Sequence, residues 1–313
     1  MRLLLGSIIL LISISNFAQY KIPRDTSFTL NGTFLKEQKK RPYITVASPQ
    51  LKKNVLLKRD IVYRILNERQ LPLDVYYPKN IHKQKPSVLL IFGGGWKSGD
   101  KSQNEAMATE LANRGYVAVS AEYRLSLEAR YPAAVNDLKA AVCWMKINAK
   151  TYGIDTSKIA VLGVSAGGQL ATLLGTTNNN PIFEDTLRDK SVSAKVHAAI
   201  DIDGILAFHH PESAEGLVAA QWLGGTYQQQ PLVWEEASAL NHIDKNTVPF
   251  LFINSSNTRF HAGRDDGIKK LDSLHIFSEV HTFPDTPHPF WFFNPWFNPM
   301  MDYIDSFLKK VLF

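Results

Sequence analysis

Cysteine is nearly absent from this chain of 313 residues, because Cys143, within AAVCWMKI, is the only one. A single cysteine excludes an intramolecular disulfide. Its apolar neighbours on a predicted helix favour a buried structural thiol over a nucleophile. Internal repeats, low-complexity tracts and linkers rich in Gly or Ser are also missing. These absences favour one domain held together by its core.

Long hydrophobic runs are missing except at the start. Residues 1–18, MRLLLGSIILLISISNFA, combine Arg2, an apolar stretch and a small residue at Ala18. The stretch falls short of the ~20 apolar residues that span a bilayer. It predicts a signal peptide over 1–18, a secreted or periplasmic protein, and no membrane contact after cleavage. No cysteine follows the stretch, so nothing favours a lipid anchor.

A strong charge of either sign is missing as well. The net charge is +6, and loss of Arg2 with the signal peptide leaves 6 − 1 = +5. The basic residues are scattered and accompany no nucleic-acid-binding module, so we expect no nucleic-acid partner. The nine histidines, including the pair His209 and His210, show no metal-ligand spacing. We therefore expect no metal site, and no cofactor is implied.

The hydrophobic pattern predicts an α/β fold. Residues 60–66 and 71–77 predict an antiparallel hairpin. After it, short apolar runs alternate with helical patterns. The predicted strands cover 87–92, 116–121, 158–163, 196–203, 249–254 and 278–283, and the predicted helices cover 104–113, 133–149 and the stretches from 166 and from 300. This alternation is typical of a mostly parallel central sheet with helices on both faces.

The domain organisation follows from the same pattern. Residues 19–59 are polar and form a predicted N-terminal extension, and residues 60–313 form the predicted domain. Residues 206–246 are too long for a simple connection and predict a small helical insert over the sheet.

The segment VLGVSAGGQ (161–169) carries the strongest chemical signal. Gly163, Ser165 and Gly167 fit G-x-S-x-G, after a predicted strand and before a predicted helix. In this context Ser165 is a candidate nucleophile, and the backbone N–H of Ala166 is a candidate oxyanion donor. The alternative is a serine that only caps the helix.

A second signal is FGGGW (92–96), at the end of a predicted strand. Three successive glycines lose much conformational entropy on folding, which favours a close approach of the backbone to a ligand. The HGGG-type loop of esterases has this role, and Gly94 and Gly95 are the candidate oxyanion donors. Phe92 stands where that motif has His, and a plain tight turn is the alternative.

A third signal is His288, in FPDTPHPFWFF (283–293) after the last predicted strand. The chain order Ser, acid, His of esterases with this elbow makes it the candidate general base. His281 lies within a predicted strand and does not fit that order.

These motifs, in order with LDVYYP, AEYRL, YPAAVNDLKAAVCWM, WLGGT and EEASALNHI, resemble the α/β-hydrolase superfamily over about residues 60 to 312. The resemblance is to its bacterial carbohydrate esterases, which include acetyl xylan esterases and feruloyl-esterase-like proteins. IDIDGILAFHHPESAEG and SSNTRFHAGRDD are more narrowly similar to esterases of plant cell-wall polysaccharide, pectin included. The resemblance implies a serine esterase without a cofactor, and a structural role for Arg124 in AEYRL.

The resemblance also exposes a missing carboxylate. Most relatives carry the catalytic acid a few residues beyond the strand that corresponds to PFLFI, where this chain has only SNT (256–258). Asp203, at the end of VHAAIDID, is one replacement, an arrangement seen in some lipases of the superfamily. Asp265 or Asp266 is the other, from the start of the next helix. Asp203 is favoured because it needs no unusual loop path. The structural alternative for Asp203 is a buried carboxylate bonded to backbone donors, and for Asp265 or Asp266 it is a cap of the helix N-terminus.

The substrate is the least determined feature. Trp96, Trp222, Trp291 and His210 are candidates to line a sugar cleft, with core packing as the alternative. Arg259 and Arg264 are candidates to bind a galacturonate carboxylate, with surface ion pairs as the alternative. We expect a polysaccharide or oligosaccharide ester substrate, with acetyl or methyl esters of pectic chains preferred over xylan. A catalytically silent carbohydrate-binding protein, a lipase and a peptidase on this fold are the alternatives.

Overall fold

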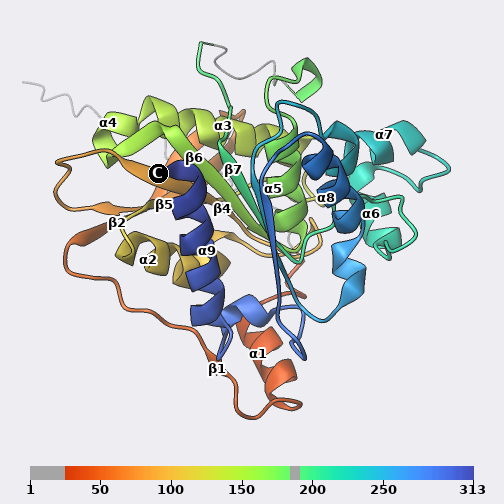
Figure 1. Cartoon of the computed structure of the whole chain (residues 1–313), viewed down its shortest axis with the longest axis horizontal. Coiled ribbons are helices and arrows are strands. Elements are labelled where there is room, and N and C mark those ends of the chain that lie inside the picture. Colours follow the sequence, from red (N-terminus) through yellow and green to blue (C-terminus); the bar gives the residue numbers. More distant parts are fainter. Residues whose placement is uncertain (1–24, 184–190) are drawn as a thin grey trace, which may run out of the picture.

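The computed structural model describes residues 25–183 and 191–313 and has an eight-stranded sheet at its centre (Figure 1). In spatial order the strands are β2 (Val55–Leu66), β3 (Arg69–Pro78), β5 (Val117–Ala121), β4 (Lys85–Ile91), β6 (Ile154–Val164), β7 (Ala198–Ile202), β8 (Phe250–Asn254) and β9 (Ser278–Thr282). The β2–β3 and β3–β5 pairs are antiparallel, and the other five pairs are parallel. The predicted α/β fold and its hairpin are confirmed.

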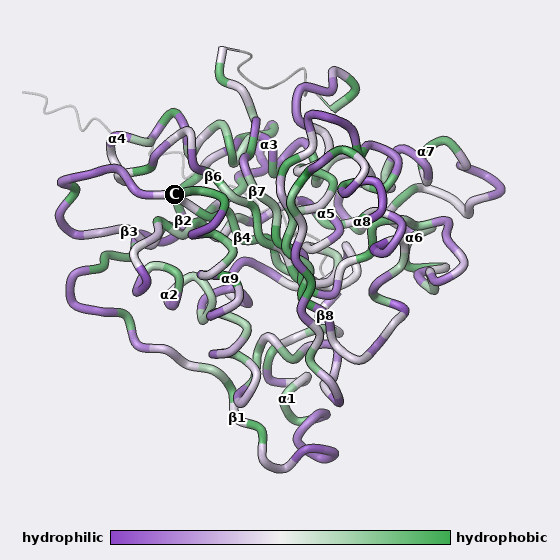
Figure 2. Tube along the Cα trace, in the orientation of Figure 1, coloured by the Kyte–Doolittle hydropathy of each residue, from purple (hydrophilic) through white to green (hydrophobic). Residues whose placement is uncertain are grey.

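Alternate residues of a strand point to opposite sides, so both faces of the sheet carry apolar side chains, and helices cover each face. On β4, Leu89 and Ile91 belong to the core beneath α3 (Ala133–Ile147), α5 (Ala166–Thr176) and α8 (Arg264–Ser273). Val88 and Leu90 belong to the opposite core, with α2 (Glu105–Asn113) and α9 (Phe297–Leu312). Figure 2 shows these strands as a hydrophobic centre within more hydrophilic loops.

Some boundaries differ from the predicted ones. β2 begins at Val55, so the sheet starts before residue 60. The predicted helix 133–149 ends at Ile147, and a short α4 (Ala149–Tyr152) follows, closed by Gly153 at φ +72°. The region 206–246 does contain helices, α6 (Gly216–Leu223) and α7 (Pro231–Glu236).

The N-terminal extension packs on the domain from residue 25 onwards. α1 (Leu30–Gln38) starts at the cap Thr29, and Phe34 contacts Phe293 with ring centroids 6.0 Å apart. β1 (Thr45–Val46) pairs antiparallel with β10 (Phe293–Asn294). The predicted signal peptide, 1–18, lies outside the described residues. Within 25–183 and 191–313, no helix is both long and apolar enough to cross a membrane.

Candidate active site

Ser165 lies in a strained turn between β6 and α5. Its backbone has φ +55° and ψ −123°, a conformation that costs about 1–3 kcal/mol for a residue with a side chain. The turn needs glycine on both sides. A Cβ at Gly163 would lie 1.8 Å from the carbonyl oxygen of Gly167, and a Cβ at Gly167 would lie 2.2 Å from that of Ile91. The G-x-S-x-G pattern thus allows the tight strand-to-helix turn that presents the Ser165 hydroxyl.

His288 meets Ser165 from the loop after β9. Its Nε2 lies 2.9 Å from Ser165 Oγ, and its Nδ1 lies 2.8 Å from Asp203 Oδ2. Phe260 stacks on the imidazole with ring centroids 3.4 Å apart, and Trp291 contacts it edge-on at 5.0 Å. The ring is therefore held in one orientation, with 17% of the side chain exposed.

Asp203 is the carboxylate that reaches His288. It follows β7 at φ +53° and is fully buried, and its Oδ1 accepts a 2.7 Å hydrogen bond from the Ser255 N–H. Asp265 and Asp266, the alternative acids, lie on α8 instead. Asp265 pairs with Arg264 at 2.8 Å, and Asp266 pairs with Lys269 at 2.9 Å. The alternative placement of the acid on α8 is therefore wrong for this fold.

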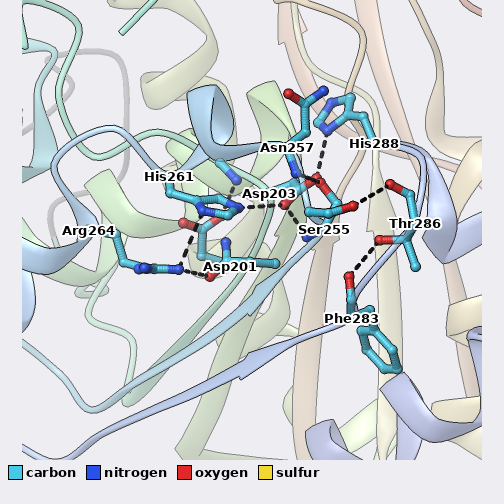
Figure 3. A network of polar contacts seen from close by, with 12 residues as sticks. Asp201, Asp203, Ser255, Asn257, His261, Arg264, Phe283, Thr286 and His288 are labelled. Atoms are coloured by element: carbon cyan, nitrogen blue, oxygen red, sulfur yellow. Dashed lines mark hydrogen bonds and ion pairs between the residues drawn. The ribbon is translucent and has the colours of Figure 1, made fainter. Parts of the chain in front are cut away.

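A second histidine stands beside the same carboxylate (Figure 3). His261 Nε2 lies 3.5 Å from Asp203 Oδ1, too long for a strong hydrogen bond. Burial by itself would raise the pKa of Asp203, but the contacts with His261, His288 and the Ser255 N–H outweigh it and hold the pKa below its ordinary value. Asp203 therefore stays ionised at neutral pH and can stabilise a protonated His288.

The glycine loop runs against the turn that holds Ser165. A Cβ at Gly93 would lie 3.0 Å from Ser165 Cβ, and Gly94 and Gly95 adopt φ +131° and +59°. In the described part of the chain, the backbone N–H groups of Gly94, Gly95 and Ala166 have no protein acceptor. Free N–H groups on two sides of a nucleophile are what an oxyanion requires.

Phe92 stands where the HGGG motif has a polar histidine, and Tyr123 supplies a polar contact to this loop instead. Its hydroxyl donates a 2.8 Å hydrogen bond to the Phe92 carbonyl, and the two rings stack with centroids 4.3 Å apart. The residue lies in AEYRL, whose Arg124 bonds Asp137 through Nε at 2.8 Å and Nη2 at 2.9 Å. Arg124 thus has the structural role that the resemblance implied.

Trp96 does not face a substrate cleft, so this expectation is corrected. Its side chain is 2% exposed, its Nε1–H donates to Gln169 Oε1 at 3.0 Å, and its ring stacks on Trp222. Trp222 and Trp291 are also buried, and His210 pairs with Asp266 at 3.3 Å. Packing of large aromatic rings in the core excludes all three tryptophans from solvent.

Arg264 does not fit the expected role in substrate binding either, because other side chains already occupy its guanidinium. Its guanidinium donates to Asn254 Oδ1 at 2.7 Å and to Asp265 at 2.8 Å, and its side chain is 17% exposed. The surface ion pair with Asp265 is the interpretation that fits. Arg264 braces the loop that carries His261, whose Nδ1 lies 3.5 Å away.

Two residues of this site were not predicted from the sequence. Phe260 and His261 lie in the segment where a carboxylate was sought, and they contact the His288 ring and the Asp203 carboxylate instead. The missing acid was the only sequence signal that this loop has a different task. Across the described ranges, no group of three His, Cys, Asp or Glu side chains is arranged to hold a metal ion.

Sequence comparisons agree with this geometry. The BD-FAE family matches residues 73–260, more than half of the chain. Esterase LipC of Mycobacterium tuberculosis is 33% identical over 192 residues, which cover 59% of this chain and 47% of LipC. The arylesterase of Saccharolobus solfataricus is 36% identical over 107 residues, which cover 34% of each protein. The chain thus spans less than half the length of these curated relatives.

Solved structures share the fold. A truncated carbohydrate esterase from gut microbiota superposes with a TM-score of 0.67 at 22% identity, covering 83% of this chain and 100% of that one. A bifunctional GH43-CE protein of Bacteroides eggerthii gives a TM-score of 0.68 at 26% identity, covering 81% of this chain and 38% of that one. With this fold and the match over residues 73–260, the chain belongs to the BD-FAE family of α/β-hydrolase esterases.

Proposed function

We propose that the protein is a serine esterase that hydrolyses ester groups on carbohydrate. The observation that carries the proposal is the pair of hydrogen bonds joining Asp203, His288 and Ser165, at 2.8 and 2.9 Å. A nucleophile, a base and an orienting acid in this order are the groups that ester hydrolysis through an acyl-enzyme needs.

The steps follow from the positions of these groups. Ser165 Oγ attacks the ester carbonyl while His288 Nε2 takes the hydroxyl proton. The carbonyl oxygen becomes an oxyanion, which accepts hydrogen bonds from the N–H groups of Gly94, Gly95 and Ala166. When the tetrahedral intermediate collapses, His288 returns the proton to the departing alcohol. Water, deprotonated by His288, then attacks the acyl-serine, and His288 returns that proton to Ser165 Oγ as the carboxylic acid leaves.

We further propose that the enzyme is exported and that its substrate is pectic. The signal-peptide pattern of residues 1–18 supports a secreted or periplasmic enzyme. The charge of +5 without that segment supports an acidic polysaccharide over a neutral one. The names of two structural relatives, a carbohydrate esterase and a GH43-CE protein, support a sugar ester in general. We therefore place acetyl or methyl esters of pectic chains ahead of acetylated xylan.

The test has two stages. A serine-directed phosphonate should label the protein once, at Ser165, and p-nitrophenyl acetate should be hydrolysed. Absence of both would favour a silent carbohydrate-binding protein. Acetylated, methyl-esterified pectin and acetylated xylan are then compared with separate assays for acetate and methanol. Release of acetate from xylan alone would refute the pectic preference.

A further inference from the structure

A cavity borders His288 on the side of the N-terminal helix. It has a volume of about 570 Å³. Its walls come from α1 and from the loops 256–260 and 286–289, which are far apart in the sequence. The lining residues include Thr33, Lys36, Lys40, Arg259, Phe260 and His288. Ser165 is not among the lining residues, so the cavity adjoins the reacting atoms without containing them.

The position of the cavity indicates that the alcohol part of the ester, and not the acyl part, would occupy it. His288 returns its proton to the departing alcohol, so the alcohol leaves along the imidazole. Because His288 and the Phe260 ring stacked on it both line the cavity, a large alcohol would extend into this space. Methanol, the alcohol of a methyl ester, is too small to use it. The sugar released from an acetyl ester is an alcohol large enough to fill this cavity.

The cavity is basic. Lys36, Lys40, Arg41 and Arg259 line it together with one carboxylate, Glu37, a balance of 4 − 1 = +3. Arg41 is neutralised by Glu37 at 2.8 Å. Arg259 stacks over Phe260 at 4.4 Å and lies 3.9 Å from Glu215.

The two lysines have no such partner. Neither Lys36 nor Lys40 has a carboxylate within 4.0 Å among the residues that the structure describes, and both are exposed. Unlike Arg41, these two ammonium groups are free to bind an anion that enters the cavity.

The helix that carries Lys36 and ends just before Lys40 is held against the domain. Thr29 caps α1 by accepting a 3.1 Å hydrogen bond from the Gly32 N–H, and Phe34 packs against Phe293. Thr33 and Lys36 are three residues apart on α1 and share one face of it, and Lys40 lies in the turn that follows the helix. The Phe34 contact holds α1 against the domain, so the backbone that carries Lys36 and leads to Lys40 is held beside the cavity.

We infer that this cavity is a subsite for a uronate unit next to the acetylated sugar of an acidic polysaccharide, with Lys36, Lys40 and Arg259 binding its carboxylate. This rests on the proposed function and narrows it from acetyl or methyl esters to acetyl esters of a polyuronate. Thr33, Ser256 and Thr286 line the same space, and their hydroxyl oxygens can accept hydrogen bonds from sugar hydroxyls.

Binding is tested without turnover. Trigalacturonate, which carries no ester, is titrated calorimetrically into the full chain, with neutral xylotriose as the matched ligand. We expect trigalacturonate to bind more tightly, and about 0.5 M salt to weaken it while leaving xylotriose unaffected, since exposed charges are screened. The variant Lys36→Gln/Lys40→Gln should raise the Kd for trigalacturonate about tenfold, because each exposed ion pair contributes up to about fivefold.

The control removes the same charge elsewhere. Lys39→Gln/Lys53→Gln replaces two exposed lysines outside the cavity and should leave the Kd within about twofold. Melting temperatures show that each variant is folded. Equal Kd values for trigalacturonate and xylotriose, equal losses in the two variants, or tighter binding of a sulfated trisaccharide would overturn the inference. A wild-type protein that binds trigalacturonate but hydrolyses no ester would instead refute the proposed function.

Discussion

Replacement of Asp203 by Asn should abolish most of the esterase activity while the protein stays folded. The Ser255 N–H donates to Asp203 Oδ1 at 2.7 Å, so the side-chain oxygen of Asn would keep that bond. Its NH₂ group would then point at His288 Nδ1, which Oδ2 contacts at 2.8 Å in the wild type. His288 must accept that bond at Nδ1 and carry its proton on Nε2, facing Ser165. In this tautomer it cannot take the Ser165 proton.

The magnitude follows from this change of tautomer. An acid-to-amide change in a triad lowers kcat by ~10⁴. This corresponds to about 5 kcal/mol of activation free energy, at about 1.4 kcal/mol for each factor of ten. The assay is kcat for p-nitrophenyl acetate together with a melting curve on the same sample.

Two matched variants test whether the effect belongs to this position. Asp265→Asn and Asp266→Asn remove a carboxylate from α8, where both side chains are largely exposed and paired with Arg264 and Lys269. They should change kcat by less than about threefold, because exposed ion pairs contribute little. A folded Asp203→Asn enzyme that retains more than a tenth of wild-type kcat, or equal losses in all three variants, would refute the reasoning.

Four further expectations concern the same elements. Ser165→Ala should lose hydrolysis, and Ser165→Gly should melt higher than Ser165→Ala, since glycine relieves the strain at φ +55°; equal melting temperatures would argue against strain. Gly163→Ala should destabilise by at least about 3 kcal/mol in urea unfolding, because its Cβ would lie 1.8 Å from a carbonyl oxygen. Tyr123→Phe should cost about 1–3 kcal/mol and lower kcat, since the buried Phe92 carbonyl loses its donor. Folding lowers the pKa of Asp203, so the stability that its ionised carboxylate contributes is fully present above the unfolded pKa of ~3.9 and is lost as the pH falls through the lower folded pKa. The difference in unfolding free energy between wild type and Asp203→Asn should therefore narrow in acid, as urea titrations at several pH values would show.

The sequence by itself determined the features that depend on neighbouring residues. The turn at Ser165 is largely local, because the glycine at 163 avoids a clash with the backbone of Gly167, four residues further along the chain. The alternation of apolar runs and helical patterns determined the parallel sheet and its two covered faces, since the period of side-chain burial is a property of each segment.

Tertiary structure alone decided which carboxylate meets His288. β7 and β8 lie side by side in parallel register, with Ile202 opposite Ile253, and this pairing brings Asp203 next to the Ser255 N–H. The sequence favoured Asp203 over Asp265 only through its expected position after a strand, because the choice depends on which strand ends share one edge of the sheet.

The surroundings of the site were decided in the same way. Trp96 is buried because Trp222, from a distant helix, stacks on it at 5.2 Å. Lys36 and Lys40 reach the cavity beside His288 because Phe34 anchors α1 on Phe293. A tryptophan or a lysine has the same local propensity whether it lines a cleft, fills a core or faces solvent. Its role is decided by contacts with residues far away in the sequence, which exist only once the chain has folded.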